Sequence, residues 1–314
     1  MPGIKPAPVP AAAYPPEIPC ASGLKRLIRA LRARRGWRGA MVVSPLLAML
    51  YLLMLPVYCL LQLTYQTQAI WAATIAIILL SCTVSVAHLG ETRGLARALL
   101  MVGIAFAITL GFELLGVATG VIFGAYSYSD QLGPKVLGLV PVLIPIAWLM
   151  MLYPAYETAR LLLPDLPKLL SLPIRAIVAA AAMTAWDLSL DPRMVHDGNW
   201  TWHNGGAGSY FGIPLSNFAG WLLVAFLIYL AWQVVDSVKS HVLQRPAWAA
   251  LPVYLYIITW LAESLANVLV WGSPLVGVVV FTGMGVFCVP ALRFMRTRNV
   301  EIWLAASQTV RRWF

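Results

Sequence analysis

The chain has 314 residues, of which 61% are hydrophobic and only 11% are charged. Because a soluble domain carries about a quarter charged residues, this composition excludes an ordinary soluble fold and predicts an all-α, polytopic membrane helical bundle. The net charge of +10 does not indicate nucleic-acid binding, because the basic residues stand at the ends of apolar segments, as orientation signals do.

The chain begins with a segment unlike the rest. Residues 1–23 are predicted to be a disordered, proline-rich tail, since the first 22 residues hold seven prolines and no apolar stretch typical of a signal peptide. Residues 24–40 carry Lys25 and six arginines without an acid, and we expect this basic segment to be cytoplasmic.

Residues 41–293 are predicted to form a single transmembrane domain. It contains eight apolar segments long enough to cross a bilayer, which takes about 20 residues each. They are 41–63, 69–89, 98–120, 136–156, 173–191, 213–235, 250–271 and 274–293. The number falls to seven if one segment is re-entrant.

Positive charge predicts the orientation of these segments. With eight spans, every basic cluster falls on one side of the membrane, which predicts that both termini are cytoplasmic. The expected location is the inner (plasma) membrane. The loops 121–135 and 192–212 then face the other side. The basic, aromatic tail 294–314 either lies along the membrane interface or frays.

A pattern of acid, glycine, paired aromatics, proline and tryptophan recurs about 74 residues apart, with one single-residue gap. The first copy is Glu113, Gly124, Tyr126, Tyr128, Pro141 and Trp148, and the second is Asp187, Gly198, Trp200, Trp202, Pro214 and Trp221. We interpret this as a two-helix unit used twice, as in many membrane folds. The alternative is coincidence, because aromatic residues and prolines gather at membrane interfaces anyway.

Four carboxyl groups lie within or beside the apolar segments, where ionisable residues are costly and usually functional. They are Glu113, Asp187, Asp191 and Glu263. A carboxylic acid removed from water tends to stay protonated, and a second carboxyl nearby strengthens this tendency. Such a group can act as a general acid with its neighbour as base, so Glu113, Asp187 and Asp191 are the candidate catalytic residues.

The spacing of Asp187 and Asp191 puts both on one helix face. Pro192 predicts that this helix ends at Asp191 and leaves that residue at the rim. The alternative is that the two aspartates cap the helix end or pair with Arg193. Glu263 is a candidate substrate-binding residue, or it bonds to Asn267 between two helices.

The paired aromatic residues are further candidates for substrate binding. Tyr126, Tyr128, Trp200, Trp202 and Trp221 either form an interfacial belt or line a pocket for a polyene and face a carbocation with their rings. Asn217 either positions a water molecule at this pocket or bonds to a neighbouring helix.

Several classes of membrane protein are disfavoured by what the chain lacks. None of the five lysines falls within an apolar segment, which excludes a retinal Schiff base. The four histidines do not form a facing pair for haem, and the four cysteines have no metal-ligand spacing. We therefore expect no metal and no cofactor.

These residues resemble a known family. The runs AWDLSLDPRMV, GNWTW and YFGIPLSNFAGW, together with FELLGVATGVIFGAYSYSDQLG and VPVLIPIAW, are similar to the membrane carotenoid-biosynthesis family that includes the carotenoid 1,2-hydratases. The resemblance covers roughly residues 98–290. It implies addition of water to the terminal C1–C2 double bond of a ψ-end group, as in lycopene or γ-carotene, to give a tertiary alcohol without a redox cofactor.

The resemblance combines with the residues into a hypothesis for the roles. Asp187 or Glu113 protonates C2, and Asp191 holds or activates the water that adds at C1. The aromatic residues face the cation or the polyene. The expected partners are a carotenoid substrate, membrane lipids and other enzymes of the pathway such as a glycosyltransferase, with no nucleic acid.

Three other functions remain open from the sequence. The chain is a non-catalytic carotenoid- or lipid-binding membrane subunit, an intramembrane prenyltransferase that uses Asp187 and Asp191 to bind a magnesium diphosphate, or a transporter built on the repeat. Co-purification of an unchanged pigment would favour the first, and magnesium-dependent use of a prenyl diphosphate would favour the second.

Overall fold

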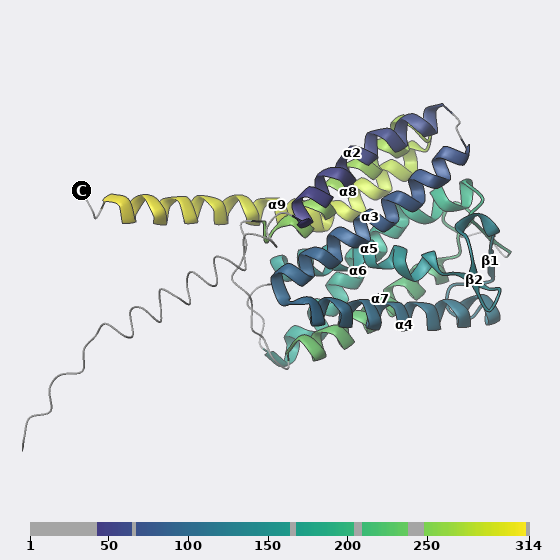
Figure 1. Ribbon diagram of the computed structural model, residues 1–314, viewed down its shortest axis with the longest axis horizontal. Helices are drawn as coiled ribbons and strands as arrows, with labels where there is room; N and C mark the ends of the chain where they lie inside the picture. The colour runs from purple at the N-terminus through teal and green to yellow at the C-terminus, as the bar shows by residue number, and fades with distance from the viewer. Residues whose placement is uncertain (1–42, 65–66, 164–167, 204–208, 238–247, 312–314) are drawn as a thin grey trace, which may run out of the picture. The chain divides into compact units, whose positions relative to one another are not determined.

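The computed structural model describes residues 43–64, 67–163, 168–203, 209–237 and 248–311, and the predicted tail 1–23 and basic segment 24–40 lie outside them. The described residues form eight α-helices (Figure 1). These are α2 (Val43–Leu63), α3 (Thr67–Arg93), α4 (Leu95–Thr119), α5 (Leu143–Leu162), α6 (Lys168–His196), α7 (Leu215–Ser237), α8 (Leu251–Leu269) and α9 (Pro274–Arg311).

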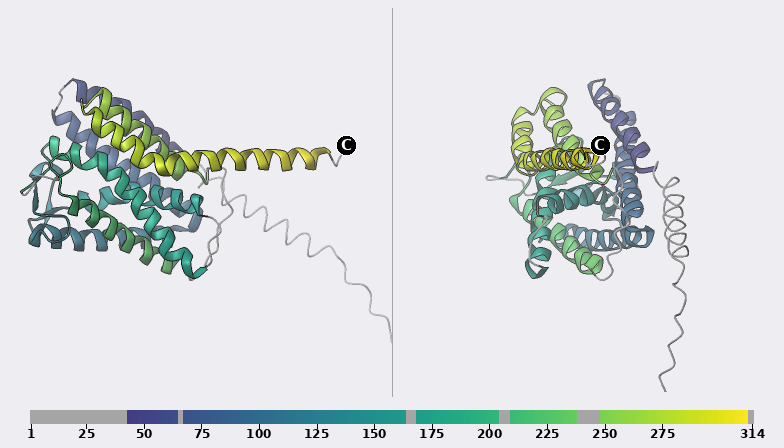
Figure 2. Two further views of the ribbon diagram at one scale, coloured as in Figure 1. Left: turned by 180° about the vertical axis from the view of Figure 1, so that it is seen from behind. Right: turned by 90° about the vertical axis from the view of Figure 1, so that its left-hand side faces the viewer.

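The predicted all-α membrane bundle is confirmed, since each of the eight apolar segments corresponds to one helix. Six of the helices, all except α5 and α6, are long and apolar enough to cross a membrane. α5 and α6 lie in the middle of the bundle, packed against each other and against α3, α4, α7, α8 and α9 (Figures 1 and 2). Because protein surrounds them, these two helices can carry ionisable residues that are costly in lipid.

The close packing of α6 depends on small side chains. Ala176, Ala179, Ala180 and Ala182 are fully buried. Small residues let helix backbones approach each other in a membrane, where van der Waals packing and hydrogen bonds replace the hydrophobic effect as the driving force. This brings the polar end of α6 close to α7.

The helix boundaries differ from the prediction at three places. α5 begins at Leu143 rather than near 136, because β2 (Lys135–Val136) and β3 (Val140–Pro141) form a short hairpin before it. α6 continues beyond Asp191 to His196. α9 runs without interruption from Pro274 to Arg311, so no helix end separates the last apolar segment from the residues that follow.

The prediction that the helix ends at Asp191 is therefore wrong, and a hydrogen bond gives the reason. Pro192 has no amide to bond to the carbonyl of Leu188 four residues earlier. The hydroxyl of Tyr210 donates to that carbonyl oxygen at 3.0 Å, so the helix continues through the proline. Asp191 is consequently a buried residue inside the helix and not a rim residue.

The same arrangement recurs in α5. Pro154 leaves the carbonyl of Met150 without its intrahelical donor, and the hydroxyl of Ser85 on α3 lies 3.3 Å from that oxygen. Side-chain hydroxyls thus replace the missing amides in both central helices, as proline-containing membrane helices require.

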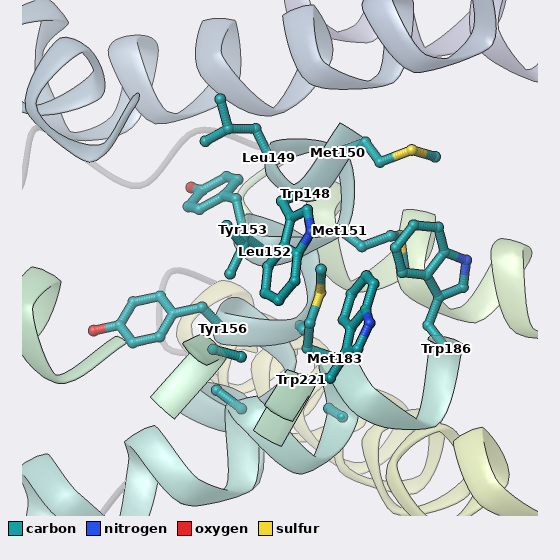
Figure 3. Close-up of a cluster of buried hydrophobic side chains, with 14 of the residues drawn as sticks. Trp148, Leu149, Met150, Met151, Leu152, Tyr153, Tyr156, Met183, Trp186 and Trp221 are labelled. Atoms are coloured by element: carbon teal, nitrogen blue, oxygen red, sulfur yellow. The ribbon is translucent and has the colours of Figure 1, made fainter. Parts of the chain in front are cut away.

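The predicted repeat appears as direct pairing between equivalent residues. The strands β1 (Tyr126–Tyr128) and β4 (Trp200–Trp202) pair antiparallel with Ser127 opposite Thr201. The rings of Trp148 and Trp221 stack with centroids 4.0 Å apart and planes 12° apart (Figure 3). Both contacts join residues at equivalent positions of the predicted two-helix unit.

The stacking of Tyr156 on Tyr229 extends this relationship along the axis. Their rings lie 5.8 Å apart at 16°, and each tyrosine follows its tryptophan, Trp148 or Trp221, by eight residues. The ring stacks and the strand pair thus join equivalent positions of the two-helix unit that the sequence predicts.

Candidate functional site

Two aspartates one turn apart on α6 meet an asparagine of α7. The Nδ2 group of Asn217 donates to Oδ2 of Asp187 at 3.0 Å and also to Oδ2 of Asp191. The indole Nε1 of Trp200 donates to Oδ1 of Asp191 at 3.2 Å. Asp187, Asp191 and Asn217 are each at most 2% exposed. A single amide group therefore holds two carboxyl groups together away from water.

The third carboxyl group comes from the equivalent position of the other repeat. Glu113 on α4 accepts hydrogen bonds from the hydroxyls of Tyr126 at 2.5 Å and Tyr128 at 2.8 Å, both to Oε2. Burial, together with the Glu113 carboxylate, raises the pKa of both tyrosines well above its usual value. Both phenols therefore remain protonated donors that stabilise negative charge on Glu113.

These groups face a cavity of about 410 Å³. Its polar lining residues are Glu113, Asp191 and Asn217, and the aromatic lining residues are Phe123, Tyr126, Tyr128, Trp148, Trp186, Trp200, Trp202 and Trp221. We call this the acid cavity. Asp187 does not line it but lies behind Asp191 and Asn217, and among the described residues its Oδ1 atom has no hydrogen-bond partner.

A tight turn brings the two repeats together at this cavity. Gly124 has φ of +96°, a conformation that side chains rarely adopt, and a Cβ atom there would lie 2.8 Å from Cγ of Pro214. Pro214 opens the turn before α7, and its carbonyl accepts the backbone amide of Asn217 at 2.9 Å. Glycine at this position therefore allows β1 and Asn217 to approach.

Glu263 is the one candidate acid that lies elsewhere. It lines a second, larger cavity of about 990 Å³ among α2, α3, α5, α6 and α8. Its Oε2 atom accepts the hydroxyl of Ser189 at 2.7 Å. The hydrogen bonds between helices that were expected here run through Ser189 of α6, which also accepts the Asn267 amide at 2.8 Å, whereas the bond from Asn267 to the Glu263 backbone carbonyl lies within α8.

The structure thus brings most of the predicted residues to one place. Glu113, Asp191, Asn217 and the five predicted aromatic residues line the acid cavity, with Asp187 directly behind. Three further aromatic lining residues, Trp148, Trp186 and Phe123, were not selected as site residues from the sequence. Trp148 could have been found from the repeat, because it is the equivalent of Trp221, whereas Phe123 carried no separate signal.

The described residues hold no group of three or more His, Cys, Asp or Glu side chains that could bind a metal ion. What the acid cavity offers is proton chemistry. Two carboxyl groups held on one amide share a proton more readily than they both ionise. Aromatic faces beside them attract positive charge, and the carboxyl group of Glu113 accepts two phenol hydrogen bonds.

Comparison with known proteins gives two matches. A family model described as "Carotenoid biosynthesis protein" matches residues 71–287. The bisanhydrobacterioruberin hydratase of Haloarcula japonica is 36% identical over 122 residues, which cover 38% of this chain and 40% of that protein. The chain therefore aligns with less than half the length of this relative. No solved structure matches the chain.

Proposed function

Because the chain belongs to the family of carotenoid biosynthesis proteins, we propose that it is a carotenoid hydratase. It adds water across the terminal C1–C2 double bond of a ψ-end group, in lycopene, γ-carotene or a related polyene, and gives a 1-hydroxy carotenoid. The observation that carries the proposal is the pair Asp187 and Asp191, held on the amide of Asn217 beside an aromatic cavity. The name of the Haloarcula relative agrees with it.

Asp191 is the group best placed to donate the proton. It lines the acid cavity, whereas Asp187 lies behind it. The pair shares one proton, which Asp191 delivers to C2 while the π-bond breaks, leaving a tertiary cation at C1. The sequence-based hypothesis gave this step to Asp187 or Glu113; the lining of the cavity favours Asp191 in contact with the alkene and Asp187 as the partner that holds the proton.

Glu113 faces the same cavity as an anion. Tyr126 and Tyr128 stabilise its charge by donating to Oε2, so it stabilises the C1 cation electrostatically. Water then forms the C–O bond at C1 and gives its proton to Glu113. Transfer of that proton back to the aspartate pair completes the cycle, and the sum of the steps is one alkene plus one water giving one alcohol.

The rings around the cavity keep bulk water from the cation. Trp148 stacks on Trp221, and Trp186 meets Trp221 edge-on with centroids 6.2 Å apart (Figure 3). Such faces attract positive charge when it is removed from water. An aromatic cavity therefore favours formation of the cation.

The prenyltransferase alternative needs groups that this cavity does not offer. A diphosphate leaving group is bound by arginine, lysine or magnesium. The described residues that line the acid cavity include no lysine or arginine, and the aspartate oxygens Oδ2 already accept the Asn217 amide. The hydratase is the function that these groups support best.

The proposal is tested in a host that produces lycopene. We expect the wild-type protein to convert lycopene to hydroxylated carotenoid, and Asp191→Asn and Glu113→Gln to lower the product by at least about 100-fold, the usual contribution of general acid–base groups. Asp187→Asn should fall between them and wild type. Asp130→Asn is the matched control, because Asp130 is an exposed acid outside the site.

Two results would count against this function. One is a wild-type protein present in the membrane that yields no hydroxylated product from any ψ-end carotenoid. The other is an Asp191→Asn variant with full activity. A pigment that co-purifies unchanged with the wild-type protein would instead favour the non-catalytic binding subunit.

A further inference from the structure

The larger cavity has a polar wall that the proposed hydration does not use. Its lining is mostly apolar and comes from five helices together with Leu132, Trp200 and Trp271. Trp186, Leu190 and Trp200 line both this cavity and the acid cavity. The two spaces are therefore neighbours that share walls.

The polar wall consists of Glu263, Arg193 and Trp271. The Asn267 amide donates to Oγ of Ser189 at 2.8 Å, and Ser189 in turn donates to the Glu263 carboxylate. Arg193 forms an ion pair with Asp197 at 2.8 Å and lies over the ring of Trp271, 4.7 Å from its centroid. These contacts fix the side chains in place.

Three buried donors at this cavity have no acceptor. Among the described residues, Nε of Arg193, Nε1 of Trp271 and Nε1 of Trp186 form no hydrogen bond, and all three residues line the cavity. An unpaired buried donor is costly and rare in folded proteins. Three of them around one cavity indicate a ligand that brings an acceptor oxygen.

The charges of the wall decide what kind of oxygen this is. The charge of Arg193 is matched by Asp197, and Glu263 adds a further carboxyl group. A carboxylate or phosphate would therefore meet an acidic group without a free cation. A hydroxyl group fits, because it accepts from the indole and guanidinium N–H groups and donates to Glu263.

The position of Arg193 on α6 indicates how far the polar wall lies from the aspartate pair. At 100° per residue, Ser189 and Arg193 lie on the opposite face of α6 from Asp187 and Asp191, with Trp186 and Leu190 between. The polar wall and the aspartate pair are thus separated by about one helix diameter, roughly 10 Å. Leu190 lines both cavities, on the side of α6 between these two groups.

We propose that the polar wall binds a hydroxyl group carried by the substrate, about one helix diameter from the double bond that is hydrated. The place of the double bond in this inference rests on the proposed hydratase function. The preferred substrate is then an isoprenoid that is already an alcohol. A hydroxyl-forming reaction must precede this enzyme and supply its substrate.

The test compares farnesol with its deoxy analogue. Farnesol carries a hydroxyl roughly one helix diameter from its terminal isoprene double bond, and the analogue lacks only the oxygen. Calorimetric titration of the purified protein in detergent should show that farnesol binds at least about tenfold tighter, the effect of one or two buried hydrogen bonds. Trp271→Phe and Glu263→Gln should reduce this preference several-fold.

Matched controls separate the hydroxyl contact from general effects. Trp271→Phe keeps a ring for Arg193 to stack on, and Trp71→Phe makes the same change at a tryptophan that does not line the larger cavity. Trp71→Phe should leave the preference for farnesol unchanged. Both probes partition into detergent in the same way in every sample. We therefore compare between variants the ratio of the two affinities, from which this effect cancels.

The outcomes distinguish this inference from the hydratase proposal. Equal binding of the two probes to wild type, or a preference that survives both Trp271→Phe and Glu263→Gln, overturns the polar wall as a hydroxyl site. A preference that is lost in these variants supports it, even if no polyene is hydrated. The absence of hydration of every polyene, with tight farnesol binding, overturns only the proposed function.

Discussion

The hydroxyl of Tyr210 donates a 3.0 Å hydrogen bond to the carbonyl oxygen of Leu188, which Pro192 leaves without its usual helical donor. Tyr210 lies just before α7, and Leu188 lies between the two aspartates on α6. This bond therefore keeps α6 helical through Asp191 and fixes both carboxyl groups on one face. On this face, both carboxyl groups accept the amide of Asn217.

A double-mutant cycle tests this relationship. We expect Tyr210→Phe to lower the free energy of unfolding by about 1–3 kcal/mol, because a part-buried carbonyl loses the hydroxyl that donates to it. In a Pro192→Ala background the loss should be much smaller, since the substitution restores the backbone amide that bonds to Leu188. Thermal unfolding in detergent measures both effects.

The control is Tyr254→Phe, which changes an exposed tyrosine on α8 and should leave the melting temperature unchanged. If Tyr210→Phe costs the same with and without Pro192, the hydroxyl does not replace the missing amide.

Much of the fold follows from the sequence, because long apolar segments have few alternatives to a membrane helix. The repeat predicted that Trp148 and Trp221 occupy equivalent positions, but it did not predict that their rings stack. The position of Asp191 was predicted wrongly, because the local rule for residues before proline says nothing about a hydroxyl supplied from a distant part of the chain. The separation of Glu263 from the other acids, and the unpaired N–H of Trp271, are properties of three-dimensional packing and have no signal in the sequence.

The two tyrosines that hold Glu113 provide a second prediction. We expect Tyr126→Phe and Tyr128→Phe each to lower hydration several-fold, and the double variant to lower it about 100-fold, because Glu113 then loses both donors that stabilise its charge. The measurement is the turnover of a ψ-end carotenoid by purified protein. Ser127→Ala lies between the two on the exposed side of β1 and should retain wild-type turnover. Full activity of the double variant would show that the hydrogen bonds from Tyr126 and Tyr128 to Glu113 are not needed for hydration.

The pH dependence follows from the direction of the tyrosine shifts. Burial and Glu113 raise the pKa of Tyr126 and Tyr128 above the usual value of about 10. Their contribution as neutral donors is therefore complete below about pH 10 and is lost only as pH rises through the raised values. We expect the turnover of wild type and of Tyr128→Phe to change with pH in the same way between about pH 7 and 9. A fall in wild-type turnover in this range that is absent from the variant would contradict the role of the tyrosines as neutral donors to Glu113.

A pair of glycines tests the close approach of the two repeats. Gly124 and Gly138 both have positive φ, at +96° and +71°, but a Cβ atom at Gly124 would lie 2.8 Å from Pro214, whereas one at Gly138 would have nothing within 4 Å. Gly138→Ala should cost about 1–2 kcal/mol of stability through backbone strain alone. Gly124→Ala should cost more and should also reduce turnover, since Pro214 positions Asn217. Equal effects on stability and turnover would show that the contact with Pro214 is unimportant.

The most direct test of hydration at the acid cavity uses isotopes of water. Purified protein in detergent is given a ψ-end carotenoid in buffer made with ¹⁸O-labelled water and deuterium oxide, and the product is analysed by mass spectrometry. Protonation at C2 followed by capture of a C1 cation predicts one ¹⁸O in the new hydroxyl and one deuterium on the adjacent carbon. An oxygen derived from dissolved O₂, or a hydroxylated product without deuterium at C2, would contradict hydration by the aspartate pair.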